Sequence, residues 1–327
     1  MFLEMILILL GFFLLIKGAD WLVDGASSLA KRLNVSDLVI GLTVVAFGTS
    51  APELAVSAIS SWSGNADIAI ANIVGSNIAN VLLILGVASI ITPLVVTKGT
   101  VWKEIPLSLL AVVLVGVMSA DAIIDDTSFS ALTRIDGLVL LSFFVIFIYY
   151  TFGLAKSEAS SQDEPGKQAK EDARPQTKLF SSLIFLTIGL VGVVLGGKLV
   201  VDNAVSIAQL MGISASLIGL TIVALGTSLP ELVTSIVAAL KKNADIAVGN
   251  VVGSNIFNVF LILGVSSVIN PLNISISGLF DIAMAIFASL LLFIFMFVGR
   301  KRILQRWQGG FFLISYFAYM IFLVFRG

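Results

Sequence analysis

The chain has 327 residues and a formal net charge of −1; 58% of its residues are hydrophobic and 12% are charged. Apolar runs of about 18 or more residues recur along it, so the sequence predicts an integral all-α membrane protein. Cysteine and histidine are both absent, which excludes disulfides, zinc motifs, thiol nucleophiles and histidine proton relays. We therefore expect no enzyme, because no recognised metal-hydrolase motif supplies the chemistry either.

Hydrophobic runs predict about ten transmembrane helices. The first run has no basic region before it and no small-residue cleavage site, so we expect a permanent helix rather than a signal peptide. The predicted spans lie near 2–19, 36–61, 67–91, 104–120, 135–154, 180–198, 213–239, 246–269, 278–298 and 309–325.

One polar stretch, residues 156–178, interrupts this pattern. It mixes charges of both signs with Pro165, Gly166 and Pro175 and has almost no apolar content. Such a composition is typical of a flexible linker. It divides the chain into two halves with five predicted helices each, 1–155 and 179–327.

The two halves carry a sequence repeat. Residues 41–94 recur at 219–272 without a gap, and 34 of the 54 positions are identical, with Glu53 placed on Glu231. Because five helices per half is an odd number, the second copy must enter the membrane from the opposite side. The sequence therefore predicts two inverted five-helix repeats, an architecture typical of transporters.

Loop charges predict the orientation in the cell membrane. On one side lie only Arg134, Lys198 and Arg326, and all other loop lysines and arginines lie on the other. The positive-inside rule makes the basic side cytoplasmic. We expect both termini outside and the central linker in the cytoplasm.

Each repeat contains the motif G-T-S-x-P-E inside a span. The proline, Pro52 or Pro230, has no N–H and its ring clashes with the carbonyl four residues back, so the helix must kink or break. Carbonyls at about 46–49 and 224–227 would then lack helical partners. In lipid, a cation in a polar cavity can satisfy such groups.

Polar side chains converge on the same point. At about 100° per residue, Ala46, Ser50, Glu53 and Ser57 share one helix face, and Thr49 neighbours Glu53. A glutamate in lipid is costly unless it is paired or faces water. No lysine or arginine lies within the motif spans, which disfavours a purely structural Glu53.

A second motif, G-S-N-I-x-N, adds a polar stripe to the third span. Its serine could also be a simple interhelical hydrogen bond, and the asparagine that precedes the motif could be scaffold or an outer part of a site. Together the motifs supply hard oxygen ligands, which suit Ca²⁺ with about 6–8 oxygens, or Na⁺, and do not suit zinc or copper. The stripe consists of Asn72, Ser76 and Asn80, with copies Asn250, Ser254 and Asn258.

GTSAPE with GSNIAN and GTSLPE with GSNIFN resemble the sodium/calcium exchanger family, within the cation/calcium antiporter superfamily. The ten-span layout extends the resemblance across nearly the whole chain, to prokaryotic members without a large regulatory loop. The resemblance implies an antiporter that exchanges Na⁺ for Ca²⁺ by alternating access, with the first and sixth helices moving against a core of spans 2–3 and 7–8.

The resemblance also implies roles for individual residues. Glu53 and Glu231 would be central ligands, and both central amide positions are Asn here where some relatives carry Asp, which leaves a formal site charge near −2. The further implied ligands are Thr49 and Thr227 for calcium; Ala46, Ser50 and Ser76 for one sodium; Ala224, Ser228 and Ser254 for another; and Asn80 and Asn258 at the amide positions.

Two alternatives stay open. A proton-driven antiporter of calcium or another divalent cation would use the same pair of carboxylates, and a passive cation channel would conduct without a counter-ion. In every case the expected partners are the transported cations and membrane lipid. We expect no cofactor, no nucleic acid and no obligate protein partner.

Overall fold

A computed structural model describes residues 2–124, 130–162, 179–211 and 224–326. Eight described helices are long and apolar enough to cross a membrane, and a bent pair over 37–62 makes a ninth. The one remaining predicted span, the seventh at 213–239, begins outside the described residues and ends in the short apolar helix α14. The predicted all-α membrane fold is confirmed.

The first half contains α1 (Phe2–Leu33), α2 (Asp37–Ile40), the π-helix η1 (Gly41–Val45), α3 (Ala46–Thr49), α4 (Ala51–Trp62), α5 (Ala66–Ile78), the π-helix η2 (Ala79–Leu85), α6 (Gly86–Ile91), β1 (Leu94–Val95), α7 (Lys98–Trp102), α8 (Glu104–Met118), α9 (Asp121–Ile124), β2 (Ser130–Leu132) and α10 (Arg134–Gln162).

The second half contains α11 (Leu179–Leu210), α13 (Ala224–Thr227), α14 (Leu229–Leu240), α15 (Ala244–Ile256), the π-helix η5 (Phe257–Leu263), α16 (Gly264–Ile269), β3 (Leu272–Ile274), α17 (Ile276–Phe295), β4 (Ile303–Leu304) and α18 (Arg306–Arg326).

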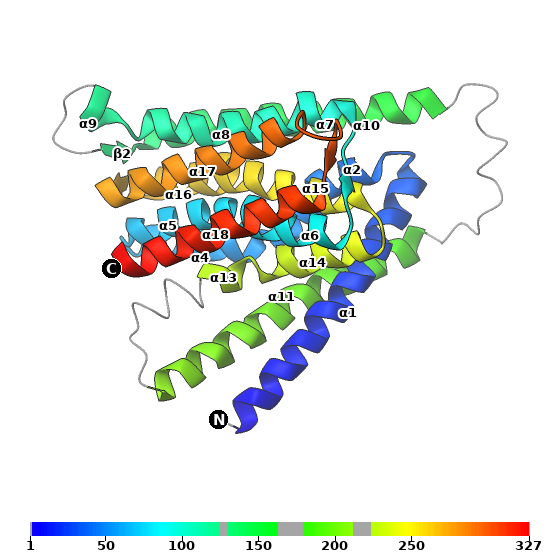
Figure 1. The fold of residues 1–327 in the computed structure, drawn as a ribbon, viewed down its shortest axis with the longest axis horizontal. Helices are drawn as coiled ribbons and strands as arrows, with labels where there is room; N and C mark the ends of the chain where they lie inside the picture. The colour runs from blue at the N-terminus through cyan, green and yellow to red at the C-terminus, as the bar shows by residue number, and fades with distance from the viewer. Residues whose placement is uncertain (1, 125–129, 163–178, 212–223, 327) are drawn as a thin grey trace.

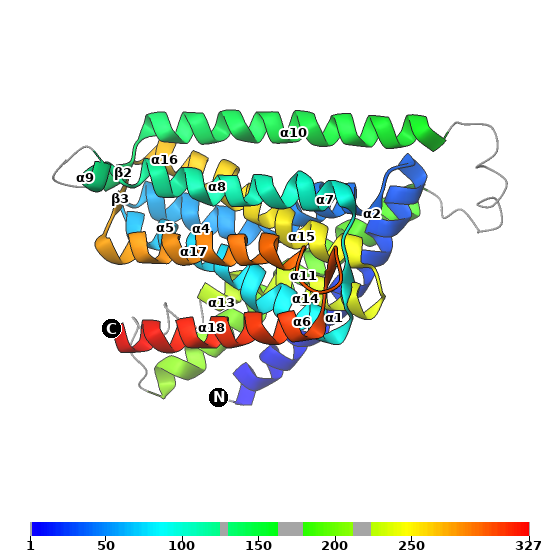
Figure 2. The ribbon, with the colours of Figure 1, turned by 45° about the horizontal axis from the view of Figure 1, so that its top comes forward.

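Helices α1 and α11 pack side by side and cross the other helices obliquely (Figures 1 and 2). Glycines allow their backbones to touch: a Cβ added at Gly18 would lie 2.6 Å from the amide nitrogen of Val193, and one at Gly196 would lie 2.6 Å from that of Leu15. Only glycine permits so close an approach. The two helices therefore form one tightly packed pair.

Both helices are longer than their apolar runs predicted. The prediction ended the first helix at residue 19 and the sixth at 198, whereas α1 continues to Leu33 and α11 to Leu210. Beyond the apolar run, α1 is amphipathic and buries Leu22, Val23 and Ala26. Packing of this face, rather than lipid contact, sustains the extra turns.

Helix α10 likewise continues to Gln162, into the segment predicted as a linker. Residues 163–178 lie outside the described part of the chain. The division into 1–155, a linker and 179–327 stays a prediction.

The spans that carry the two motifs form the centre of the bundle. In the most apolar windows of 68–91 and 244–269, 78% of residues are buried, against 17% for the window in α10. Helices α8, α10, α17 and α18 lie around them (Figure 2). The motif residues are thus shielded from lipid by protein on most sides.

Two short antiparallel ribbons join the halves reciprocally. Strand β1 pairs with β4, with Leu94 opposite Leu304, and β2 pairs with β3, with Leu132 opposite Leu272. The repeat places Leu94 of β1 on Leu272 of β3. Each ribbon therefore contains one strand from each half, and the strand that β1 provides in one ribbon is provided by its repeat equivalent, β3, in the other. Such reciprocity is the signature of two-fold pseudosymmetry, and with five helices per half it confirms the inverted repeat.

One group of ion pairs, which we call the Lys241 tie, occurs at only one end of the bundle and breaks this symmetry. At the end of α14, Lys241 Nζ lies 2.6 Å from Asp20 Oδ1 and 2.7 Å from Asp24 Oδ1 on α1. The repeat places Lys241 on Ser63 and Asp20 on Lys198, so the equivalent ion pairs cannot form at the other end of the bundle.

A neighbouring network strengthens the tie. Asn243 Nδ2 donates to Ser27 Oγ at 2.9 Å and to Asp37 Oδ2 at 2.6 Å. The repeat equivalent of Ser27 is Val205, which cannot hydrogen bond. Helix α1 is therefore fastened to the second half on the side that the loop charges predict to be cytoplasmic.

Replacing Lys241 with Met is expected to loosen this end of α1, because two ion pairs and a bond to the Asp20 carbonyl are lost together. Hydrogen exchange of the α1 amides from Asp20 to Leu33 should rise by about 2- to 5-fold, an effect of up to about 1 kcal/mol. Lys242→Met is the matched control, since Lys242 is exposed and forms no ion pair within the described residues. Equal exchange in the two variants would contradict the assigned tie.

Candidate cation site

Each motif glutamate follows a helix break. Helix α3 ends at Thr49 and α4 begins at Ala51 with a bend of 46°, and Ser50 between them has φ −82° and ψ 6°. The equivalent Ser228 separates α13 from α14 with φ −85° and ψ 4°. The predicted interruption beside the prolines is confirmed, and it places each glutamate in the first turn of the following helix.

The expectation that the Ala46 carbonyl lacks a helical partner is wrong. It accepts the Ser50 amide at 3.0 Å and the Thr49 hydroxyl at 3.4 Å. The reason is that the helix bends at Ser50 instead of unwinding by a full turn. The role of Ala46 as a sodium ligand stays a prediction, and Ala224 lies at the edge of the described residues.

The two glutamates are buried and are held from the opposite repeat. Glu53 and Glu231 are each 1% exposed. Ser50 donates to Glu231 Oε1 at 3.0 Å, and Ser228 donates to Glu53 Oε1 at 3.4 Å. Each carboxylate also sits at a helix N-terminus, where the helix dipole favours negative charge. Neither forms an ion pair with a lysine or arginine in the described part of the chain.

The asparagines before the second motif connect the same helices. Thr49 Oγ1 donates to Asn250 Oδ1 at 3.0 Å, and Thr227 Oγ1 donates to Asn72 Oδ1 at 3.1 Å. The side-chain nitrogen Nδ2 of Asn72 in turn donates to Ser57 Oγ at 3.0 Å. The sequence did not decide whether Asn72 and Asn250 belong to the scaffold or to the site. In the structure, each accepts a hydrogen bond from the motif threonine of the other half.

The motif serines lie in the same network. Ser228 Oγ donates to Ser76 Oγ at 3.0 Å, and Ser254 donates to Glu231 Oε1 at 3.5 Å. Ser76 and Ser254 therefore both make interhelical hydrogen bonds, the simpler alternative. Ser254 contacts Glu231 itself, and Ser76 is joined to Glu53 through Ser228. Their role as sodium ligands stays a prediction.

Four buried oxygens of the motifs have no hydrogen-bond partner among the residues that the structure describes: Glu53 Oε2, Glu231 Oε2, Asn80 Oδ1 and Asn258 Oδ1. All four are acceptors, and they come as two symmetry-related pairs. A buried acceptor without a partner is costly, and a group of them is the complement of a cation. No cluster of three or more His, Cys, Asp or Glu residues occurs in the described residues, so neutral oxygens would have to complete the coordination.

The amide pair emerges from π-helical turns, which the sequence did not predict. Asn80 is the second residue of η2 and Asn258 the second residue of η5. Across the two-fold, η2 packs against α14 and η5 against α4. Such bulges are frequent at functional sites, but hydrophobic periodicity gives no signal for them.

Sequence reasoning also passed over Asn77 and Asn255. They contact Asn258 and Asn80, and their only signal was that both copies of G-S-N-I-x-N contain this asparagine. Of the predicted ligands, Ser228 and Thr227 contact Glu53, and Ser50, Ser254 and Thr49 contact Glu231. Ser76 is joined to Glu53 through Ser228, and Asn72 and Asn250 hold the two threonines.

The chain is similar to known cation exchangers along nearly its whole length. The family model described as "Sodium/calcium exchanger protein" matches residues 3–153 and 181–325. The chain is 38% identical to the putative antiporter CaxA of Alkalimonas amylolytica, over 97% of this chain and 98% of that protein. It is 34% identical to the sodium/calcium exchanger MaX1 of Methanosarcina acetivorans, over 97% of each.

A solved structure is similar throughout. The sodium-calcium exchanger NCX_Mj, soaked with 10 mM Na⁺ and zero Ca²⁺, superposes with a TM-score of 0.83 at 36% identity, and the match covers 98% of each chain.

The unpartnered oxygens predict that Ca²⁺ stabilises the purified protein. At a concentration of 100 times the dissociation constant, a ligand of the folded state adds about 2.7 kcal/mol to the free energy of unfolding. Thermal unfolding in detergent should show the corresponding rise in Tm, and Glu53→Gln should remove it.

Glu104→Gln is the matched control, because Glu104 is equally buried, accepts from Tyr150 at Oε1 and likewise has an Oε2 without a partner among the described residues, but it lies on α8, outside both motifs. A calcium-dependent rise that persists in Glu53→Gln would contradict the assignment of the site.

Proposed function

Because the chain belongs to the sodium/calcium exchanger family, we propose that it exchanges Na⁺ for Ca²⁺ across the membrane by alternating access, at a site centred on Glu53 and Glu231. The family makes it a multi-pass membrane transporter of the cation/calcium antiporter class. The finer proposal rests on one observation above all: two buried carboxylate oxygens and two buried amide oxygens, on helices that pack against one another, have no hydrogen-bond partner among the described residues.

The donor set supports the choice of ions. Carboxylate, amide and hydroxyl oxygens are the ligands that Ca²⁺ and Na⁺ prefer, and no nitrogen or sulfur ligand is in the set. Two ionised glutamates carry a charge of −2, which one Ca²⁺ would neutralise. Since Na⁺ would need the same carboxylates, the two ions exclude each other, and this competition couples their opposite movements.

The helix packing supports alternating access. The α1–α11 pair packs tightly within itself, and its ties to the core are unequal at the two ends. Movement of this pair against the symmetric core would expose the site to one side at a time. In the proposed orientation the termini lie outside, so the contacts of Lys241 with α1 lie at the cytoplasmic end.

A proton-driven exchange of calcium or another divalent cation is the second candidate. It is favoured by the burial of both carboxylates without a basic partner in the described residues, because protons can neutralise such a pair. The names of the relatives include a sodium/calcium exchanger, MaX1, which supports sodium.

Uptake of radiolabelled calcium into proteoliposomes distinguishes the candidates. We expect uptake with an outward Na⁺ gradient and none with a proton gradient alone or without a gradient. Glu53→Gln and Glu231→Gln should each lower the initial rate of uptake by at least about a hundredfold. Each removes one buried charge that would face the bound cation, and loss of one partner of a buried ion pair costs about 3–5 kcal/mol.

Glu104→Gln should transport normally and controls for loss of a buried glutamate. Uptake driven by protons alone would replace sodium with the second candidate, and uptake without any gradient would contradict antiport.

A further inference from the structure

Each of the two central amides is hydrogen-bonded across the two-fold. Asn80 and Asn258 leave their oxygens unpartnered, but their nitrogens are not free. Asn258 Nδ2 donates to Asn77 Oδ1 at 2.9 Å, and Asn80 Nδ2 donates to Asn255 Oδ1 at 2.9 Å. Each amide is thus held by the asparagine of the opposite repeat.

This matters because an asparagine amide can present either of two faces. Its oxygen accepts and can bind a cation, whereas its NH₂ group only donates and repels one. Rotation by 180° about the last side-chain bond exchanges the two with almost no change of shape. The presence of Asn in the sequence therefore does not by itself provide a cation ligand.

For Asn258 the choice is anchored to the backbone. Asn77 Nδ2 donates to the backbone carbonyl of Asn255 at 3.4 Å, and a carbonyl cannot exchange its acceptor for a donor. Asn77 Oδ1 must then face Asn258, so Asn258 turns its nitrogen to Asn77 and leaves its oxygen unpartnered. Asn255 has no such anchor, because its Nδ2 has no hydrogen-bond partner among the described residues, and its hold on Asn80 is the single bond to Oδ1.

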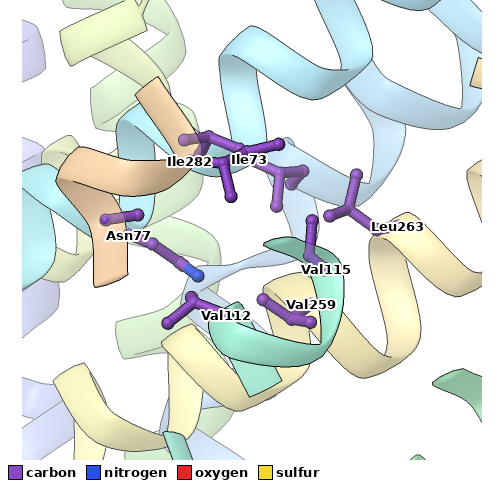
Figure 3. A pocket seen from close by; sticks show the side chains of 9 residues that line it. Ile73, Asn77, Val112, Val115, Val259, Leu263 and Ile282 are labelled. Atoms are coloured by element: carbon purple, nitrogen blue, oxygen red, sulfur yellow. The ribbon is translucent and has the colours of Figure 1, made fainter. Parts of the chain in front are cut away.

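Nothing else competes for the Asn77 amide on its outer side. Asn77 is 2% exposed, and Figure 3 shows it as the polar residue at a cavity of about 10 Å³ whose other lining residues, such as Val112 and Val259, are apolar. This cavity contains no carboxylate and is not the cation site. Because the lining of this cavity offers Asn77 no polar partner, the hydrogen bonds of Asn77 to Asn255 and Asn258 set its orientation.

We propose that Asn77 and Asn255 are positioning residues of the cation site, which hold Asn258 and Asn80 with their oxygens toward the ion. They do not bind the ion themselves. The inference rests on the proposed function and extends it, because it explains how a site with only two charges can offer further oxygen ligands. It also makes each repeat depend on the other for the orientation of its amide.

The test is a double-mutant cycle on calcium binding, measured by titration calorimetry of the purified protein. Asn77→Leu removes the acceptor and should weaken binding by about tenfold, the loss expected when a ligand oxygen is no longer held in place. In an Asn258→Asp background the same substitution should cost less than about twofold, because a carboxylate offers oxygen whichever way it turns.

Two further variants separate positioning from packing. Asn77→Gln keeps an amide acceptor without adding a charge and should bind calcium more tightly than Asn77→Leu. Asn255→Leu in the Asn258→Asp background should retain its full loss, since Asn255 holds Asn80 and not residue 258. If Asn77→Leu does not fold, the cycle is run with Asn77→Ser, whose side chain is shorter but polar.

The possible results are distinct. Equal losses from Asn77→Leu in both backgrounds would show a merely structural role and overturn the inference while leaving the proposed function intact. A parent protein that binds no calcium would overturn the proposed function and this inference with it.

Discussion

The structure depends on the burial of two carboxylates that have no basic partner among the described residues. Glu53 and Glu231 are each 1% exposed, Glu53 in the bent span over 37–62 and Glu231 in the apolar helix α14, and an uncompensated charge in such surroundings is expensive. The broken helices bring their N-termini to the carboxylates, and the serines of the break donate to them from the opposite repeat. These contacts satisfy one oxygen of each glutamate, and a cation is the natural partner for the other.

The reciprocity of the contacts explains why neither repeat can form the site alone. Ser50 donates to the glutamate of the second half, and Ser228 donates to the glutamate of the first. The amides of Asn80 and Asn258 are likewise bonded by asparagines of the opposite half. The centre is nearly symmetric, whereas the periphery is not. Lys241 fastens α1 at one end of the bundle, and its repeat equivalent is a serine, Ser63. Such an arrangement keeps the ligands constant while it distinguishes the two sides of the membrane.

Much of this could be predicted from the sequence, because lipid imposes strong constraints. Long apolar runs gave the spans, proline gave the helix breaks, and the repeat related Glu53 to Glu231. What failed depended on packing. The added turns of α1 are stabilised by buried contacts rather than by hydropathy, the bend at Ser50 left the Ala46 carbonyl bonded, and the π-helical turns have no periodic signature. The role of Asn77 arises only when the second repeat is placed against the first.

A crystal structure of the protein with bound Ca²⁺, in which calcium is located by its anomalous scattering, would show whether the ion lies between Glu53 and Glu231. We expect one strong peak on the two-fold, at about 2.3–2.6 Å from the oxygens it binds, with Glu53 Oε2 and Glu231 Oε2 both among them. Calcium bound only elsewhere, with both of these oxygens still unpartnered, would contradict this placement of the ion.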